Sequence, residues 1–155
     1  MQLAVHWPEV WKLVEEPPVT LASFTLDDLL AARIENHIER VSEIAAQASG
    51  EADILKNIEE IRVAWETTNF TIKNYRDTKD RFYITEIEDL TTLLEDHQMR
   101  VQGCMGSRHV ARIRADVEAW ERKLGTVSDV IDEWLVFQKS WMYLENIFNA
   151  EDIIK

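Results

Sequence analysis

The side chains that could carry out chemistry are few: one cysteine, Cys104, and four histidines, at positions 6, 37, 97 and 109. A histidine beside a cysteine can hold the thiol as a reactive thiolate. Only Cys104 and His109 are near enough in sequence for this, with Gly106 between them. The alternative is a small unreactive thiol in a loop, and we expect this alternative because no further residue completes a catalytic arrangement.

Metal and nucleotide sites have spacing requirements that this sequence does not meet. A carboxylate-bridged di-iron bundle needs Glu three residues before His, and the residues at those places are Leu3, Ile34, Leu94 and Gly106. No CxxC or HExxH pattern is present to bind zinc. The glycines at 50, 103, 106 and 125 form no GxxxxGK[ST] loop. We therefore predict no metal, no cofactor and no catalytic residue in this chain.

Adjacent acidic residues are another candidate for chemistry, as at Glu59 and Glu60 or Glu95 and Asp96. Neighbouring helical positions point about 100° apart, so such pairs do not act together, and we interpret them as solvated helix faces. His97 follows Asp96, which is the setting of a switch near neutral pH. We expect instead a plain surface or partly buried histidine.

The composition indicates a folded helical protein. The chain has 155 residues, 46% of them hydrophobic and 30% charged, with four glycines and three prolines. Its net charge of −12 repels nucleic acids, anionic membranes and the acidic face of a microtubule. The sequence shows neither a secretory leader nor an apolar run of membrane-spanning length. With one cysteine, we expect a reducing, cytosolic compartment.

The first 66 residues have helical periodicity. Apolar residues from Trp7 to Val14 predict a first helix with Pro8 in its first turn. Thr25 is an N-cap signal for a second helix, which carries an apolar stripe to Ala48 and should end at Ser49 and Gly50. The segment 51–66 repeats the pattern. We expect these last two helices to pack as an antiparallel hairpin.

The period changes after residue 67. Alternating apolar residues on both sides of the charged stretch 76–81 predict a β-hairpin. Thr85 and Glu88 resemble a capping box that opens the next helix, which should run to a break at Gly103–Ser107.

Apolar residues at helical spacing continue from His109 for about forty residues, with Gly125 as the weakest point. One glycine costs a helix only about 1 kcal/mol, so we favour one continuous helix over two abutting ones. The predicted fold class is all-α: an elongated antiparallel helical bundle with one short β-hairpin near residues 69–84. We expect one domain over 1–155, with N-terminal helices at 1–66, the hairpin at 67–84 and long helices at 85–155.

Aromatic residues are densest between Asp132 and Ile153, where Trp134 and Trp141 lie seven residues apart. A helix rarely exposes so much aromatic area, which favours a core role for this face. The alternative is a ridge that docks a partner.

This segment resembles the EWLxVQxxWxYLExIFxxxDI signature of the linker of dynein heavy chains. Shorter resemblances occur upstream in the same order: HW at 6–7, FTLDDLL at 24–30, LLEDHQ at 93–98, GSRHV at 106–110 and WERKL at 120–124. The variants at GSRHV and IFNAEDI are more similar to axonemal than to cytoplasmic dyneins. We expect the residues that carry the resemblance to be core or packing residues: His6, Trp7, Phe24, Leu26, Leu29, Trp120, Trp134, Gln138, Trp141, Tyr143, Leu144, Glu145 and Phe148.

The resemblance implies a function. Such a segment is part of a rod that arches over an AAA+ ring and swings as the ring hydrolyses ATP, which moves the motor along microtubules. ATP and Mg²⁺ then belong to the parent motor and no cofactor to this fragment. The implied partners are the AAA+ ring and the remaining linker of the same heavy chain, together with dynein intermediate and light chains. No nucleic acid, membrane or direct microtubule contact is expected.

The implied location is the cytoplasm and cytoskeleton, in particular the axoneme of a cilium or flagellum. Since family members continue beyond this segment, we expect apolar surface near 147–154 to lack its neighbours. An alternative interpretation, from periodicity and acidity alone, is a generic acidic helical scaffold or protein-interaction module.

Overall fold

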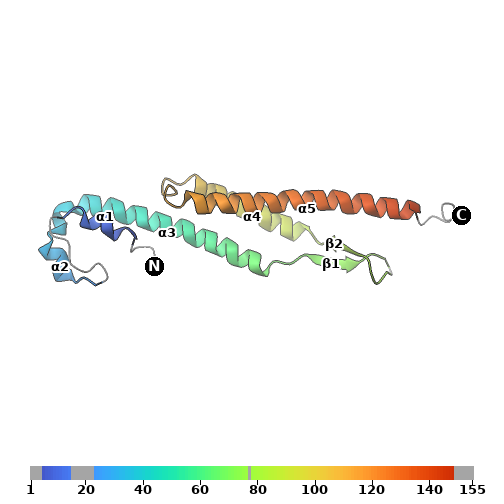
Figure 1. Ribbon diagram of the computed structural model, residues 1–155, viewed down its shortest axis with the longest axis horizontal. Coiled ribbons are helices and arrows are strands. Elements are labelled where there is room, and N and C mark those ends of the chain that lie inside the picture. Colours follow the sequence, from blue (N-terminus) through green and yellow to red (C-terminus); the bar gives the residue numbers. More distant parts are fainter. Residues whose placement is uncertain (1–4, 15–22, 77, 149–155) are drawn as a thin grey trace. The chain divides into compact units, whose positions relative to one another are not determined.

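The computed structural model describes residues 5–14, 23–76 and 78–148. The elements in this part are α1 (Trp7–Trp11), α2 (Leu26–Ala31), the 3-10 helix η2 (Ile34–His37), α3 (Ile38–Thr67), β1 (Thr71–Asn74), β2 (Phe82–Thr85), α4 (Glu88–Met105) and α5 (Arg114–Phe148) (Figure 1). The prediction of a mostly helical chain with one β-hairpin is confirmed. Among these described helices, none is both long and apolar enough to cross a membrane.

Residue contacts divide the chain into two compact units. Unit 1 comprises 1–56 and 107–113, and unit 2 comprises 57–106 and 114–155. The helix α3 contributes residues 38–56 to unit 1 and residues 57–67 to unit 2. Periodicity and the family resemblance predict instead one bundle of three consecutive parts. The division into two units depends on contacts between segments far apart in sequence, which periodicity does not reveal.

In unit 1, α1 buries Val10 and Trp11, and the facing part of α3 buries Ile44 and Ala48. The start of α2 follows the prediction at Thr25, whose backbone N–H donates to Asp28 Oδ2 at 2.7 Å while its hydroxyl accepts from the Asp28 N–H at 3.3 Å. The predicted continuous helix to Ala48 is wrong, because Arg33 adopts a left-handed conformation, with φ 51°, after α2.

The predicted break at Ser49 and Gly50 is also wrong, and so is the helical hairpin that depended on it. The helix α3 runs without interruption for 30 residues, from Ile38 to Thr67. One interior glycine costs about 1 kcal/mol, and the neighbouring alanines have the highest helix propensity of any residue. A glycine is required at position 50 because the His109 ring lies directly against it.

Unit 2 contains the hairpin, where β1 pairs antiparallel with β2 and Ile72 faces Ile84. The expected capping box at Thr85 and Glu88 is wrong. Thr85 is the last residue of β2, Glu86 is left-handed, and α4 begins at Glu88 without a side-chain cap. The strand pairing of Thr85 therefore takes precedence over its capping potential.

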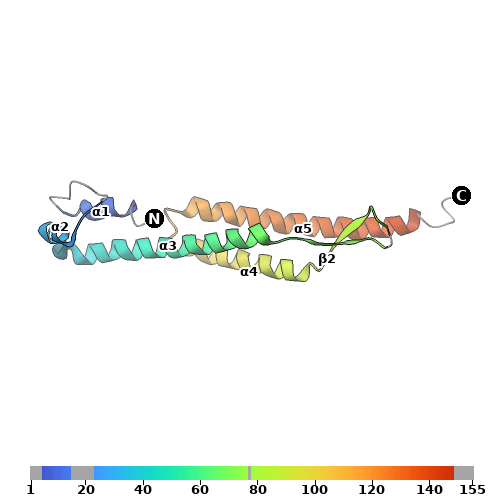
Figure 2. The ribbon, with the colours of Figure 1, turned by 90° about the horizontal axis from the view of Figure 1, so that it is seen from below.

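The helices α4 and α5 lie side by side in unit 2 and run in opposite directions (Figures 1 and 2). The helix α4 continues through Gly103 to Met105. The first three residues of the predicted break at 103–107 are therefore helical. The helix α5 begins at Arg114, after a turn in which Val110 and Ile113 are buried. It passes through Gly125 as one helix of 35 residues, which confirms the predicted continuity.

Candidate functional site: side-chain clamps on the long helices

Three polar and aromatic residues of α5 hold the β-hairpin. Gln138, Trp141 and Glu145 are spaced by three and four residues, which places them on one face of the helix. The Gln138 Nε2 donates to the Ile84 carbonyl oxygen at 2.9 Å, and the Ile84 N–H donates to Gln138 Oε1 at 2.7 Å. The side-chain amide therefore binds one residue of β2 as a neighbouring strand would.

The hairpin's charged end is held by Glu145, whose side chain is only 10% exposed. Arg81 donates to Glu145 Oε1 at 2.6 Å, and Arg76 Nη1 lies 3.5 Å from Oε2. Beside this ion pair, the Tyr75 and Trp141 rings meet edge to face, with centroids 5.1 Å apart. Arg76 and Arg81, at the two ends of the charged 76–81 stretch, thus contact a carboxylate of α5.

A buried histidine links α3 to α4 in unit 2. The Trp65 Nε1–H donates to His97 Nδ1 at 2.9 Å, and His97 is 3% exposed. Since the Nδ1 accepts, the proton of the neutral ring lies on Nε2. Burial lowers the pKa of His97, and the Arg100 charge lowers it further, against a smaller opposite effect of Asp96. The expected surface or partly buried histidine is therefore buried.

Cys104 lies within α4 and is buried, so the expectation of a thiol in a loop is wrong. Burial raises the pKa of Cys104 above its ordinary value, although the Arg100 charge opposes this. A thiol that stays protonated at neutral pH is a poor nucleophile.

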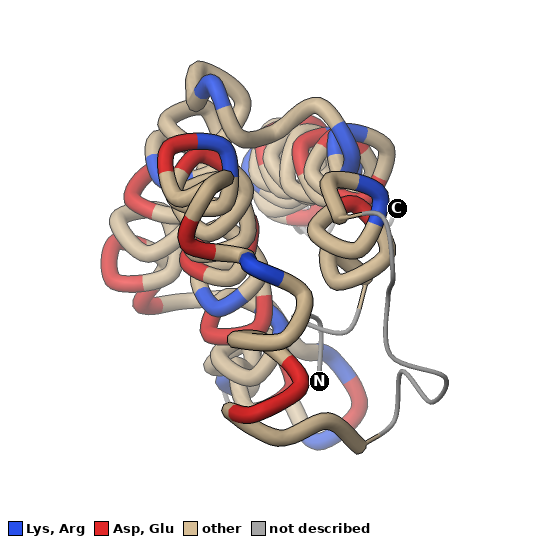
Figure 3. The backbone as a smooth tube through the Cα atoms, turned by 90° about the vertical axis from the view of Figure 1, so that its left-hand side faces the viewer, with Lys and Arg blue, Asp and Glu red and all other residues tan. Residues whose placement is uncertain are grey.

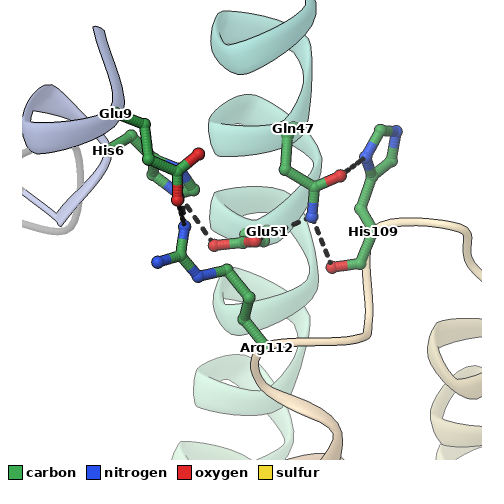
Figure 4. A network of polar contacts seen from close by, with 6 residues as sticks. All are labelled: His6, Glu9, Gln47, Glu51, His109 and Arg112. Carbon is green, nitrogen blue, oxygen red and sulfur yellow. Dashed lines mark hydrogen bonds and ion pairs between the residues drawn. The ribbon is translucent and has the colours of Figure 1, made fainter. Parts of the chain in front are cut away.

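A second group of polar residues joins α1, α3 and the 107–113 turn in unit 1 (Figure 4). His6 Nε2 and Glu51 Oε2 are 2.9 Å apart, and both residues are buried. Arg112 Nη1 lies 3.2 Å from His6 Nδ1 and donates to Glu9 at 2.8 Å. Because arginine has only donors, His6 Nδ1 accepts, and its Nε2–H donates to Glu51.

Gln47 and His109 form the other half of this group of polar residues, which we call the unit 1 clamp. Gln47 Nε2 donates to Glu51 Oε1 at 2.7 Å and to the His109 carbonyl at 3.3 Å. Its Oε1 can only accept, so His109 Nδ1–H donates to it at 2.8 Å. A Cβ at Gly50 would overlap the His109 ring, which lies directly against the backbone of α3 there. Gly50 therefore makes room for the clamp.

An aromatic cluster completes unit 1. The Trp7 and Trp11 rings stack with centroids 5.6 Å apart, and Phe24 packs edge-on against both, at 4.5 and 5.1 Å. Of the family signature, Trp7 and Phe24 lie in this cluster, and His6 lies beside it against Glu51. Two further signature residues are half-buried: Leu29 in unit 1 and Trp120 in unit 2. The Lys123 ammonium lies 4.7 Å from the Trp120 ring centroid.

Five of the signature residues lie outside the core of the described chain: Leu26, Trp134, Tyr143, Leu144 and Phe148. Trp134 nevertheless packs against the Phe137 ring, with centroids 5.9 Å apart. The sequence patterns did not predict the partners that complete the two groups of polar contacts: Gln47, Glu51, Arg76, Arg81 and Arg112. A polar residue on a helix carries no mark of a distant partner in the sequence, so helical periodicity could not identify these contacts.

The described polar groups bind one another in both clamps and are not arranged around a vacant position. Within residues 5–14, 23–76 and 78–148, no group of three His, Cys, Asp or Glu residues is placed to hold a metal ion. Figure 3, which shows the long helices end-on, has both acidic and basic positions on the described helices. In both groups, the side chains fasten helices, strands and turns to one another.

Comparison with known proteins gives one consistent result. The family described as dynein heavy chain, N-terminal region 2, matches residues 2–155. The chain is 36% identical over 151 residues to dynein axonemal heavy chain 2 of Mus musculus, covering 97% of this chain and 3% of that protein. It is 34% identical over 149 residues to dynein axonemal heavy chain 3 of Homo sapiens, covering 96% of this chain and 4% of the relative.

A third relative is dynein axonemal heavy chain 6 of Homo sapiens, 32% identical over 151 residues, or 97% of this chain and 4% of the relative. The chain thus spans only a few per cent of the length of the relatives it matches. The match extends over almost the whole chain, and these relatives are of the axonemal type that the GSRHV and IFNAEDI variants indicate. The chain belongs to the dynein heavy-chain family, as part of its N-terminal region.

Proposed function

We propose that this chain is a non-catalytic mechanical linker segment of a dynein microtubule motor. In this proposal it transmits ATP-driven changes of an AAA+ ring, which lies outside the segment, into movement. The observation that carries the proposal is the combination of the family match with helices fastened along their length by side-chain clamps. The helices α3 and α5, of 30 and 35 residues, correspond to about 45 and 52 Å of continuous backbone.

The clamps support a load-bearing role for a physical reason. An isolated helix bends or frays where its backbone is unsupported, and packing against neighbours prevents this. Gln138 and Glu145 fasten the hairpin to α5 near its C-terminal end, and His97 fastens α3 to α4. A force applied to one element of unit 2 is thereby passed to the others.

The proposed partners follow from this role: the ring and the remaining linker of the same heavy chain, and intermediate and light chains in the parent complex. ATP and Mg²⁺ are assigned to the ring. The net charge of −12 supports a location away from the acidic microtubule surface. By analogy with axonemal relatives, the proposed location is the cytoskeleton of a cilium or flagellum.

The test uses a heavy chain that contains this segment. Its deletion should abolish microtubule gliding, and its restoration should recover gliding. Restoration with Gln138→Ala and Glu145→Ala together should give slower gliding at a retained ring ATPase, because the clamp to the hairpin is lost. Lys139→Ala, exposed on the same helix, is the matched control. ATP hydrolysis by the isolated 155-residue chain, or full gliding without the segment, would contradict the proposal.

A second candidate function, an acidic helical interaction module, is favoured by the exposure of Trp134 and its neighbours. Trp134→Ala distinguishes the two. Loss of partner binding at an unchanged melting temperature favours the interaction module, whereas loss of gliding without loss of any partner favours the mechanical linker.

A further inference from the structure

The strand β1 has backbone groups that point away from the rest of the hairpin. The two strands pair over four residues, and Ile72 faces Ile84. Both backbone groups of Ile84 bond to the Gln138 side chain on the side away from β1. In an antiparallel ladder, the two members of such a pair direct their N–H and C=O groups away from each other. The N–H and C=O of Ile72 therefore project from the outer edge of β1.

A second hydrogen bond confirms this alternation. The Tyr75 N–H donates to the Arg81 carbonyl oxygen at 2.8 Å, so the Tyr75 N–H points toward the other strand. Because backbone direction alternates along a strand, Lys73 also points toward β2, and Asn74 points outward with Ile72. In the part of the chain that the structure describes, no residue outside the hairpin bonds to the backbone of Ile72 or Asn74. These two residues form what we call the open edge of β1.

The open edge is accessible and lies beside apolar side chains. All four residues of β1 are exposed, Ile72 to 61%. Phe82, which pairs with Asn74 and so shares the face of Ile72, is 57% exposed. Many edge strands are blocked by a proline, a bulge or a lysine. The strand β1 has no proline and no bulge, and its Lys73 lies on the opposite face, where its ammonium pairs with Glu86 at 2.5 Å.

The open edge identifies its occupant as an extended chain. Outward N–H and C=O groups recur at every second residue of β1, a spacing of roughly 6.8 Å. A neighbouring strand presents the matching groups at the same interval, whereas a helix directs its backbone groups along its own axis. Side chains of the added strand alternate between the two faces of the hairpin. Those on the face of Ile72 should be apolar, and those on the face of Thr71 and Lys73 polar or acidic.

The lysine favours an acidic partner over a second copy of this chain. The Lys73 side chain is 54% exposed and its ammonium has three donors, so it can bind a second carboxylate beside Glu86. Antiparallel pairing of two β1 strands centred on Ile72 would place Lys73 opposite Thr71, where no carboxylate is present. Each copy would also bring a net charge of −12, which opposes self-association.

We propose that the open edge of β1 binds an extended segment of a partner protein, which adds a third strand to the hairpin and alternates apolar with polar or acidic side chains. The probe is the peptide VTVEVTV, joined to fluorescein through a polar linker. Two control peptides carry two N-methyl groups each, either on the inner valines, whose N–H groups face β1, or on the threonines, whose N–H groups face away. By fluorescence anisotropy, the valine-methylated peptide should bind the 155-residue chain at least about tenfold more weakly than the threonine-methylated one.

A peptide with Lys in place of Glu tests the acidic character of the partner. It should bind about two- to fivefold more weakly than the Glu peptide, because the attraction of Lys73 is replaced by repulsion.

Hydrogen exchange locates the bound strand. The Ile72 and Asn74 amides should exchange fast in the free chain and at least about tenfold more slowly at saturating peptide. The Lys73 amide, which points toward β2, should change by less than about twofold and is the internal control.

Two substitutions at one position separate the edge from the hairpin. Ile72→Pro removes an outward N–H and no bond between β1 and β2, so it should weaken binding about tenfold while the Ile84 amide stays protected. Ile72→Val keeps the N–H and should bind the peptide within about twofold of the wild type. If Ile72→Pro exposes the Ile84 amide, the hairpin itself is lost, and the two methylated peptides decide the matter on the unchanged chain.

The proposal is overturned by equal binding of the two methylated peptides, or by an Ile72 amide that stays unprotected at saturating peptide. Equal binding of the Lys and Glu peptides would overturn the acidic character of the partner. A dimer in sedimentation that Ile72→Pro dissociates, and with which the peptide competes, would assign the open edge to a second copy.

Discussion

The side chain of Gln138 and the backbone of Ile84 exchange two hydrogen bonds, at 2.7 and 2.9 Å. One residue of α5 thus satisfies both backbone groups of one residue of β2. The pair explains the glutamine at this position of the signature segment, because its side-chain amide makes the two hydrogen bonds that a neighbouring strand would make.

Gln138→Glu tests this exchange. A carboxylate keeps the acceptor but cannot donate to the Ile84 carbonyl, so we expect a loss of about 1–3 kcal/mol in the free energy of unfolding. The measurement is urea denaturation. Gln138→Ala should in addition speed hydrogen exchange at the Ile84 amide, whereas the exposed control Lys139→Ala should alter neither quantity. An unchanged Ile84 exchange rate in Gln138→Ala would show that the amide is protected by other contacts.

Two glycines in helix interiors should respond with opposite signs to the same change. At Gly50 an added Cβ overlaps the His109 ring, so Gly50→Ala should displace His109 from Gln47 and destabilise unit 1 by about 1–3 kcal/mol. At Gly125 nothing lies within 4 Å of the added Cβ. Gly125→Ala should therefore stabilise the chain by about 0.5–1 kcal/mol.

Thermal unfolding followed by circular dichroism measures both glycine variants. Stabilisation by Gly50→Ala would mean that His109 does not pack against α3.

The ion pair between Glu145 and Arg81 should contribute more than an exposed pair. Glu145 is 10% exposed, whereas Arg40 and Glu43 are each 65% exposed. A double-mutant cycle to alanine should give a coupling energy of about 1 kcal/mol for Glu145 and Arg81, and below about 0.5 kcal/mol for Arg40 and Glu43. Equal couplings would contradict the role assigned to Glu145.

Unfolding should depend on pH through His97. Its folded pKa lies below the ordinary value of 6.5, so the unfolded state binds the proton more readily. The stability that neutral His97 provides is complete above pH 6.5 and is lost as the pH falls below it. In His97→Asn the amide oxygen can still accept from Trp65 but does not titrate.

The urea midpoint of His97→Asn should therefore fall less than that of the wild type between pH 7.5 and 5.5. His37→Asn is the control, since the His37 side chain makes no hydrogen bond within the described part of the chain. A wild-type pH dependence in His97→Asn would assign the effect to another group.

Periodicity and local capping determined the elements that depend on neighbours along the chain. The helical face of α5, the hairpin strands and the start of α2 at Thr25 are all set by residues within a few positions of one another. The same local rules failed at Gly50 and Thr85. There, contacts with His109 and with Thr71, both distant in sequence, outweighed a preference of about 1 kcal/mol.

By itself, the sequence determined the family and the helical character, because a long ordered signature and a 3.6-residue period survive without knowledge of contacts. Only the tertiary structure decided what the signature residues do. Gln138 and Glu145 hold the hairpin, His6 joins a clamp, and Trp134 and Phe137 are exposed. The reason is that a side chain's role depends on which distant groups surround it. The apolar residues of a helix have the same spacing in the sequence whether another element covers them or solvent surrounds them.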